Sequence, residues 1–209
     1  MLITFEGIDK AGKTTQLDRI YHILEKNYPK KVLKTKEPSD CFFGNKISEL
    51  TKSKNYPKTS FSDTLLFMSN RHLNWENSIK HALKNDYIVL CDRFIDSTMV
   101  YQHFANDNPC CLDIIKDMHN LATNNTWPDL TFIFDIDVDE YEKRLESNDD
   151  YYETSDLSLV KRRRDAFLAL SFTDPRYVIV NGKAPVNDIT DIIKDSIKEK
   201  LNDFKRRVN

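Results

Sequence analysis

The segment from Gly7 to Thr14 matches the pattern G-x-x-x-x-G-K-[ST], which is typical of a phosphate-binding P-loop. Glycines let such a backbone curl so that its N–H groups point at phosphate oxygens, while Lys13 adds a cation and the Thr14 hydroxyl can bind Mg²⁺. An apolar run at residues 2–5 precedes the loop, and residues 15–27 are expected to form a helix whose positive N-terminal end also favours phosphate. This order favours a phosphate site over the alternative, a glycine-containing turn into an ordinary helix.

A second candidate segment begins at Asp92, which follows an apolar run at residues 87–91. A carboxylate at the end of a buried strand, beside a P-loop, can hold Mg²⁺ or its bound water. The planar guanidinium of Arg93 suits a phosphate group. If residues 96–104 are helical, four hydrogen-bonding side chains share one face at i, i+4 spacing, namely Ser97 with Tyr101 and Thr98 with Gln102. The alternative is a strand-end ion pair before an ordinary polar helix face, and the neighbouring P-loop favours function.

Residues 62–84 are expected to form one long helix. Residues at steps of three and four make its predicted core stripe, which consists of Phe61, Leu65, Met68, His72, Trp75 and Ile79. Phe67 and Arg71 lie off this stripe and one turn apart, so the ring could stack on a base and the guanidinium could bind the edge of that base. On spacing alone an alternative is equally open, in which Phe67 fills a small apolar cluster and Arg71 is solvated. His72 and His81 are interpreted as packing or surface residues.

A basic run, Lys161-Arg162-Arg163-Arg164, follows a polar stretch at residues 147–156 that is rich in Asp, Tyr and Ser. The polar stretch is typical of a loop that closes over a site, and such a lid can carry an arginine to a transferring phosphoryl group. A charge run on a helix is more often a solvated face. The P-loop elsewhere in the chain favours a role for one of these four residues.

Apolar runs alternate with helical patterns along the chain. After the first run, strands are expected at residues 32–36, 87–91, 130–136 and 177–180. Besides 15–27, helices are expected at residues 44–52, 62–84, 96–104, 112–123, 139–146, 157–171 and 186–207. The alternation predicts an α/β fold, a doubly wound parallel five-stranded sheet with helices on both faces. Ligands bind such sheets beyond the carboxyl ends of the strands, so Gly7, Glu37 and Asp92 are expected to be neighbours.

Composition narrows the class of protein. With 209 residues, no internal repeats and no low-complexity linker, residues 1–209 are expected to form one domain with a lid insertion at residues 147–156. A net charge of −2 gives no electrostatic basis for binding nucleic acid or a membrane surface. No apolar run approaches the ~20 residues of a membrane span. The four cysteines lack metal-ligand spacing, which predicts reduced thiols and a cytoplasmic protein.

Taken together, several segments resemble the thymidylate kinase family of nucleoside monophosphate kinases. They are residues 5–15, Lys36-Glu37-Pro38, residues 66–71, residues 92–102, Pro128-Asp129-Leu130-Thr131 and Phe167-Leu168-Ala169-Leu170. Many proteins share the P-loop, whereas the pair of Phe67 and Arg71 and the segment from Asp92 to Gln102 are far more specific to this family. The resemblance implies a P-loop kinase fold that transfers the γ-phosphoryl group of Mg-ATP to dTMP, giving ADP and dTDP for dTTP synthesis.

The resemblance also implies the binding residues. The ATP phosphates would be held by Gly7, Ile8, Asp9, Lys10, Ala11, Gly12, Lys13 and Thr14, with Mg²⁺ on Thr14 and Asp92. The acceptor dTMP would be bound by Asp9, Glu37, Pro38, Phe67, Arg71, Arg93, Ser97, Thr98, Tyr101 and Gln102. In this set Phe67 would stack on thymine, Arg71 would donate to a thymine carbonyl and Arg93 would clamp the phosphate. Tyr101 would crowd the sugar edge and disfavour a 2′-hydroxyl.

The residues implied to act in catalysis are Lys10, Lys13, Asp92, Arg93 and Arg162. The attacking group is already a phosphate oxyanion, so alignment and charge neutralisation are expected to suffice without a side-chain base. Members of the family are commonly homodimers that pair through helices, so a homodimer is expected.

The chain departs from the family pattern in two places. Many members read Glu-Pro-Gly-Gly where this chain has Ser39-Asp40 in place of the glycines, and Ser48 occupies a position where they carry an arginine. Many lids contain Asp-Arg-x-Glu, whereas Tyr151 stands at the arginine position here. We therefore hypothesise that Lys10, a cation within the P-loop, supplies the transition-state charge, aided by Arg162, which aligns with a basic family position.

Three rival functions are weighed against this one. A deoxynucleoside kinase or another monophosphate kinase would need acceptor residues different from Phe67, Arg71 and Gln102. A GTPase-type switch would carry an Asn-Lys-x-Asp signature, which this chain lacks. A non-catalytic protein that binds dTMP or ATP would be stabilised by ligand without producing ADP.

Overall fold

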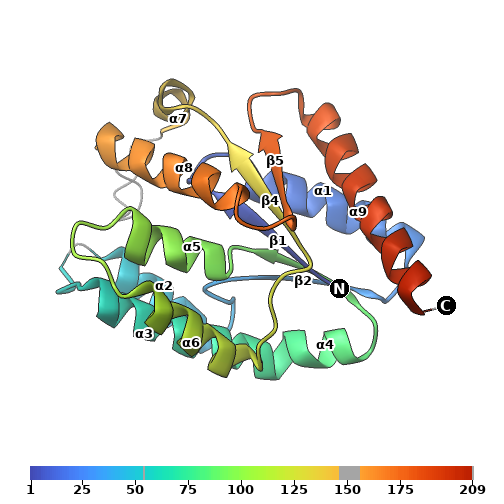
Figure 1. Cartoon of the computed structure of the whole chain (residues 1–209), viewed down its shortest axis with the longest axis horizontal. Coiled ribbons are helices and arrows are strands. Elements are labelled where there is room, and N and C mark those ends of the chain that lie inside the picture. The colour runs from blue at the N-terminus through green and yellow to red at the C-terminus, as the bar shows by residue number, and fades with distance from the viewer. Residues whose placement is uncertain (54, 146–155, 209) are drawn as a thin grey trace.

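Five parallel strands form the centre of the fold, in the order β2-β3-β1-β4-β5 (Figure 1). The strands are β1 Leu2–Gly7, β2 Val32–Lys36, β3 Ile88–Asp92, β4 Leu130–Asp135 and β5 Tyr177–Asn181. The computed structural model describes residues 1–53, 55–145 and 156–208, with side chains to residue 203. Strands β1, β3 and β4 are buried along nearly their whole length, as apolar runs in a doubly covered sheet should be. The predicted five-stranded parallel sheet is confirmed.

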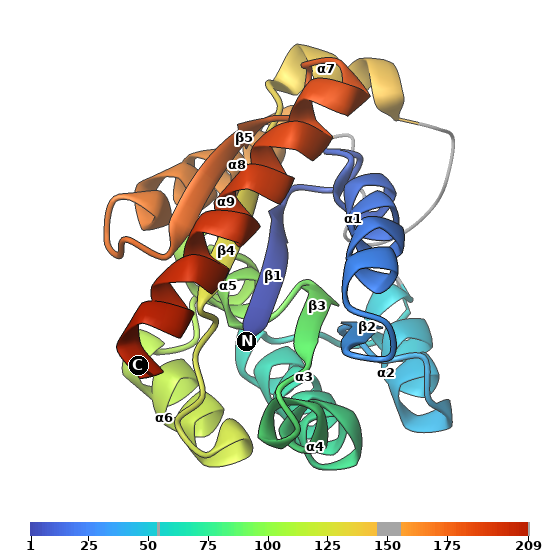
Figure 2. The same cartoon turned by 90° about the vertical axis from the view of Figure 1, so that its right-hand side faces the viewer.

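Helices cover both faces of the sheet (Figure 2). They are α1 Lys13–Asn27, α2 Phe42–Lys52, α3 Ser60–Asn74, α4 Lys80–Lys84, α5 Ile95–Met99, α6 Leu112–Thr123, α7 Val138–Arg144, α8 Leu157–Ser171 and α9 Val186–Val208. On one face α1 and α9 pack against each other and against the strands. On the other, α4, α5 and α8 contact the sheet, while α3 packs against α2 and α6. The helices thus complete the doubly wound architecture.

Two predicted helices are interrupted by π turns. The helix expected at residues 62–84 begins at Ser60 and runs as α3, the π segment η1 (Trp75–Ile79) and α4. The helix expected at residues 96–104 runs as α5 and the π segment η2 (Val100–Phe104). A π turn takes one extra residue and shifts the side chains that follow it, and such turns are frequent at functional sites. Simple 3.6-residue spacing therefore describes these segments only in part.

The predicted core stripe of α3 is wrong at three of its six positions. Phe61 and Leu65 are 49% and 45% exposed, and His72 is exposed as well. The buried face of α3 is instead largely polar and faces the β2 side of the molecule. For example, Asn70 donates to the Ser39 hydroxyl from this face. The helix is thus held by buried hydrogen bonds on its inner side and leaves apolar residues at the surface.

Some sequence predictions lie outside these observations. The lid predicted at residues 147–156 falls, except for Asp156, outside the described residues, so the single domain with a lid stays a prediction. Asp156 itself caps α8, because its carboxylate accepts hydrogen bonds from the backbone of Ser158 and Leu159. All four cysteines are free thiols. Across the described ranges, we found no helix with the length and apolar character needed to cross a membrane.

Candidate active site

The P-loop connects β1 to α1 through backbone conformations that only glycine adopts easily. Gly7 has a φ of +133°, and a Cβ at this position would lie 2.5 Å from the carbonyl oxygen of Phe134. Gly12 has a φ of +95° immediately before α1. Both positions therefore favour glycine for conformation, and Gly7 also for space. Beneath the loop, Ile8 and Ala11 are buried in the core.

Two lysines of the loop differ in environment. Lys13 is buried, and its Nζ donates to the carbonyl oxygens of Gly7 at 3.2 Å and Ile8 at 2.7 Å. Burial lowers the pKa of Lys13 to about 8, helped by the nearby Arg93 and opposed by neighbouring carboxylates. Lys10 lies within the loop with a φ of +61°, and its carbonyl oxygen accepts a hydrogen bond from Arg144 at 3.1 Å. Both cations therefore stand at the phosphate-binding turn.

Oxygen atoms suited to a divalent cation meet beside the loop. The Thr14 hydroxyl donates to Oδ2 of Asp92 at 2.7 Å. The other carboxylate oxygen of Asp92, Oδ1, is buried and accepts no hydrogen bond from any described residue. A buried acceptor without a donor is suited to a metal ion or to a metal-bound water. The residues present thus fit Mg²⁺, which prefers oxygen ligands.

Arg93 joins the loop to α5. Its backbone adopts φ +66°, an uncommon conformation outside glycine that recurs at functional sites. Its guanidinium donates to the Gly7 carbonyl at 3.1 Å, to the Ser97 hydroxyl at 2.9 Å and to the Asp9 carboxylate at 2.5 Å. Burial alone would raise the pKa of Asp9, but Arg93, Lys13 and other cations hold it below its usual value. An ionised carboxylate and a fixed arginine therefore share the edge of the loop.

One cavity of about 350 Å³ opens at the carboxyl ends of β1, β2 and β3. Twelve of the residues predicted for the site line it: Asp9, Thr14, Glu37, Pro38, Phe67, Arg71, Asp92, Arg93, Ser97, Thr98, Tyr101 and Gln102. Its volume lies within the range of small-molecule sites, ~300–1,000 Å³. The expected neighbourhood of Glu37 and Asp92 is confirmed, and the backbone N–H of Glu37 donates to the Asp92 carbonyl at 3.0 Å.

The far end of the cavity is built around Arg71, which is only 1% exposed. Its Nε donates to the Glu37 carboxylate at 2.8 Å and its Nη2 to the Thr98 hydroxyl at 3.0 Å. Its guanidinium also lies 4.8 Å from the ring centroid of Phe94. The alternative in which Arg71 is solvated is therefore wrong. With Phe67 in the same lining, this end offers an aromatic ring and a fixed donor.

Sequence reasoning missed four lining residues, Lys36, Thr51, Lys52 and Phe94. Thr51 and Lys52 lie three and four positions after Ser48, which also lines the cavity, so helical spacing from Ser48 was an available signal. Lys36 directly precedes Glu37 at the end of a predicted strand. These residues add two lysines to the side of the cavity that β2 and α2 form.

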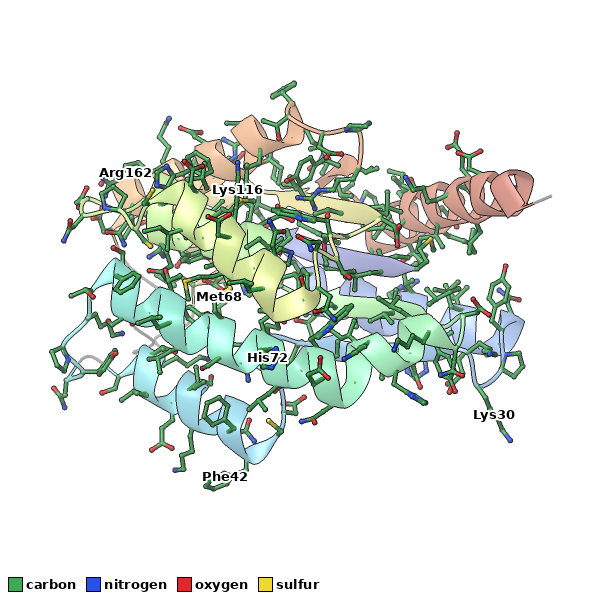
Figure 3. The ribbon with its side chains drawn as sticks, turned by 60° about the horizontal axis from the view of Figure 1, so that its bottom comes forward. Lys30, Phe42, Met68, His72, Lys116 and Arg162 are labelled. Atoms are coloured by element: carbon green, nitrogen blue, oxygen red, sulfur yellow. The ribbon has the colours of Figure 1, made fainter. Side chains whose placement is uncertain are left out.

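The structure does not bring Arg162 to the cavity. Arg162 is exposed on α8 and pairs with Asp107 at 2.5 Å, at the molecular edge seen in Figure 3. The next residue, Arg163, is buried instead. Its spacing from Val160 and Phe167, three and four positions away on the apolar face, was the signal that could have identified it.

Comparisons with known proteins identify the family of this chain. The thymidylate kinase family model matches residues 5–193. The thymidylate kinase of Sulfurihydrogenibium sp. is 38% identical over 200 residues, covering 95% of this chain and 97% of that protein. The thymidylate kinase of Ehrlichia chaffeensis is 36% identical over 194 residues, covering 92% of this chain and 93% of that protein. A solved structure of the Ehrlichia chaffeensis enzyme superposes with a TM-score of 0.78 at 28% identity and covers 95% of this chain and 98% of its own. The chain therefore belongs to the thymidylate kinase family, a group of phosphotransferases.

Proposed function

We propose how this chain carries out the reaction of its family, the transfer of the γ-phosphoryl group of ATP to dTMP, giving ADP and dTDP. One observation carries the proposal. A P-loop and a nucleotide-sized cavity meet at Asp9, Thr14, Asp92 and Arg93, so a donor phosphate and an acceptor phosphate would approach each other there.

The donor side uses the backbone N–H groups of residues 7–14 to hold the phosphates of ATP. The Lys13 ammonium turns from the loop carbonyls toward the outer phosphates. Thr14 and Asp92 hold Mg²⁺, whose chemistry is to neutralise charge on the transferred group. Among the described residues, the unpartnered Oδ1 of Asp92 supports this assignment.

The acceptor side divides into a base end and a phosphate end. Phe67 stacks on thymine, Arg71 donates to a thymine carbonyl, and Thr98 and Gln102 face the base. Tyr101, near Ser97, crowds the sugar edge where a ribonucleotide carries its 2′-hydroxyl. This selection would favour a deoxyribonucleotide with a thymine base.

At the phosphate end Arg93 clamps the acceptor phosphate beside Asp9, while Glu37 and Pro38 line the cavity on the way to Arg71 and the base. Arg93 donates to Asp9, and an incoming phosphate would compete with that carboxylate for the guanidinium. No side-chain base is needed, since the nucleophile is an oxyanion. Lys10 supplies further transition-state charge. The assistance expected from Arg162 stays a prediction.

The chain is also proposed to act as a cytoplasmic homodimer. Helices α2, α3 and α6 lie side by side, with Phe42 pointing away from the protein (Figure 3). Their exposed apolar residues are Phe42, Phe43, Leu50, Phe61, Leu65, Ile114 and Leu121. Exposed apolar residues on neighbouring helices support an interaction site on this side of the protein. Sedimentation velocity would distinguish a dimer from a monomer, and Phe61→Glu together with Leu65→Glu should shift the equilibrium to monomer.

The test of the reaction is a coupled ADP-release assay with Mg-ATP against dTMP, dUMP, dCMP, dGMP, thymidine and no acceptor. A strong preference for dTMP supports the proposal. Turnover on thymidine but not dTMP would identify a nucleoside kinase. Binding of dTMP without ADP release would identify a ligand-binding protein.

A further inference from the structure

Arg163 is a buried arginine on the apolar face of α8. It is 7% exposed and shares this face with Val160, Ala166, Phe167 and Leu170. An isolated charge on such a face is costly to bury, and an apolar residue would pack there more cheaply. The groups that face Arg163 therefore bear on why an arginine occupies this position.

One group that faces Arg163 is the ring of Tyr101, which lines the acceptor cavity. The Arg163 guanidinium lies 4.6 Å from the centroid of the Tyr101 ring, and the Arg93 guanidinium lies 5.5 Å from the same centroid. Phe167, one turn after Arg163, meets the ring edge-on at a centroid distance of 6.3 Å. The Tyr101 hydroxyl donates to Asp9 at 3.3 Å. The ring is thus held from α8 at one side and from the P-loop at the other.

The charge of Arg163 suits this position. It faces the Asp9 carboxylate closely enough to contribute to the lowered pKa of Asp9, together with Arg93 and Lys13. A cation is attracted to the face of an aromatic ring, most strongly where the cation is desolvated. Arg163 therefore stabilises both the tyrosine ring and the carboxylate that binds its hydroxyl.

The other cations of the basic run face elsewhere. Lys161 pairs with Asp165 on the surface of α8, and Arg164 pairs with Asp135 at 2.5 Å and 2.9 Å. Arg162 pairs with Asp107, as described above. Within this run, Arg163 contacts a side chain that lines the cavity, that of Tyr101.

We propose that Arg163 is a positioning residue that fixes the Tyr101 ring against the sugar side of the acceptor cavity and thereby sets the preference for 2′-deoxyribonucleotides. This rests on the proposed function, because the role of Tyr101 toward the sugar is part of it. A ring that loses its support from α8 can swing aside and leave room for a 2′-hydroxyl. The effect should therefore appear in acceptor selection more than in the use of ATP.

The test compares Arg163→Met, which keeps an unbranched side chain without charge, with Arg163→Lys and the matched surface control Lys161→Met. The readout is kcat/KM for dTMP against ribothymidine 5′-monophosphate, with KM for ATP measured alongside. Arg163→Met should reduce the preference for dTMP at least about tenfold and change KM for ATP little. Arg163→Lys should be intermediate and Lys161→Met unchanged. A preference within about twofold of wild type in Arg163→Met would overturn the proposal.

A double-mutant cycle tests whether Arg163 acts through Tyr101 rather than through a general effect on folding. Tyr101→Ala should reduce the same preference, and adding Arg163→Met or Arg163→Lys to it should have no further effect. Additive effects would show that Arg163 acts independently of Tyr101 and would refute the proposal. If wild type binds dTMP without turnover, the proposed function fails, whereas the ratio of the two acceptors' dissociation constants by calorimetry still tests Arg163.

Discussion

Arg71 on α3 and Glu37, directly after β2, form a buried ion pair with an N–O distance of 2.8 Å. Burial raises the pKa of Glu37 above its ordinary value, and Arg71 opposes that rise. The pair thus fixes a donor at the base end of the cavity, and Arg71 favours the charged form of the buried Glu37 carboxylate. Binding and stability are linked at this point.

Substitution of Arg71 separates these two roles. Arg71→Met should raise KM for dTMP about tenfold or more through the lost donor, and should lower stability by about 3–5 kcal/mol because Glu37 is left buried without its partner. Arg71→Met combined with Glu37→Gln should recover much of the stability without recovering dTMP binding. Urea unfolding and steady-state kinetics measure the two effects. Recovery of dTMP binding in the double variant would contradict the role of Arg71.

Substitution of Asp92 tests the metal site. Asp92→Asn keeps an acceptor for the Thr14 hydroxyl but removes the charge, so the Mg²⁺ concentration for half-maximal activity should rise about 10- to 100-fold. Chelation by EDTA should stop turnover in wild type. Asp165→Asn, which removes an exposed carboxylate on α8, is the matched control and should leave the Mg²⁺ requirement unchanged. An unchanged requirement in Asp92→Asn would refute the assignment.

Substitution of Lys10 tests the source of transition-state charge. Lys10→Ala should lower kcat on the order of 100- to 1,000-fold with a smaller change in KM for dTMP, as for loss of one transition-state contact. Lys30→Ala is a matched control, since Lys30 is an exposed lysine with the same φ of +61°. Both variants therefore carry the same backbone strain. A kcat close to wild type in Lys10→Ala would rule out this hypothesis.

The buried carboxyl group of Glu6 should make the stability of the protein depend on pH. It lies beneath Ser97 and accepts hydrogen bonds from the Ser97 hydroxyl at 2.6 Å and the Phe94 backbone at 2.7 Å. Burial, reinforced by Asp96, raises the pKa of Glu6 to about 8. The folded state then holds a proton that the unfolded state releases near pH ~4.5.

The raised pKa of Glu6 determines whether stability rises or falls with pH. The contribution of Glu6 to stability is fully present below about pH 4.5 and is lost as the pH rises to about 8, because the folded state binds more protons across this window. Thermal unfolding of wild type and Glu6→Gln across the window is the measurement. Wild type should lose stability relative to Glu6→Gln as the pH rises. Parallel curves would show that Glu6 does not titrate in this range.

The phosphate site could be predicted from sequence because its chemistry is local. Residues 7–14 act largely through their own backbone, and two glycines with a following helix are enough to define that conformation. The alternation of apolar runs with helices likewise determined the parallel sheet, and with it the meeting of Glu37 and Asp92 at one edge.

The tertiary structure alone decided which arginines face the site. Arg71 on α3 is buried with Glu37, which lies 34 positions earlier in the chain and accepts a hydrogen bond from its guanidinium. On α8, neighbours one position apart diverge, since helical geometry turns Arg162 toward Asp107 at the surface and Arg163 toward Tyr101. Charge and spacing in a basic run do not determine how the helix is rotated. The packing of α8 against η2 and the sheet determines it.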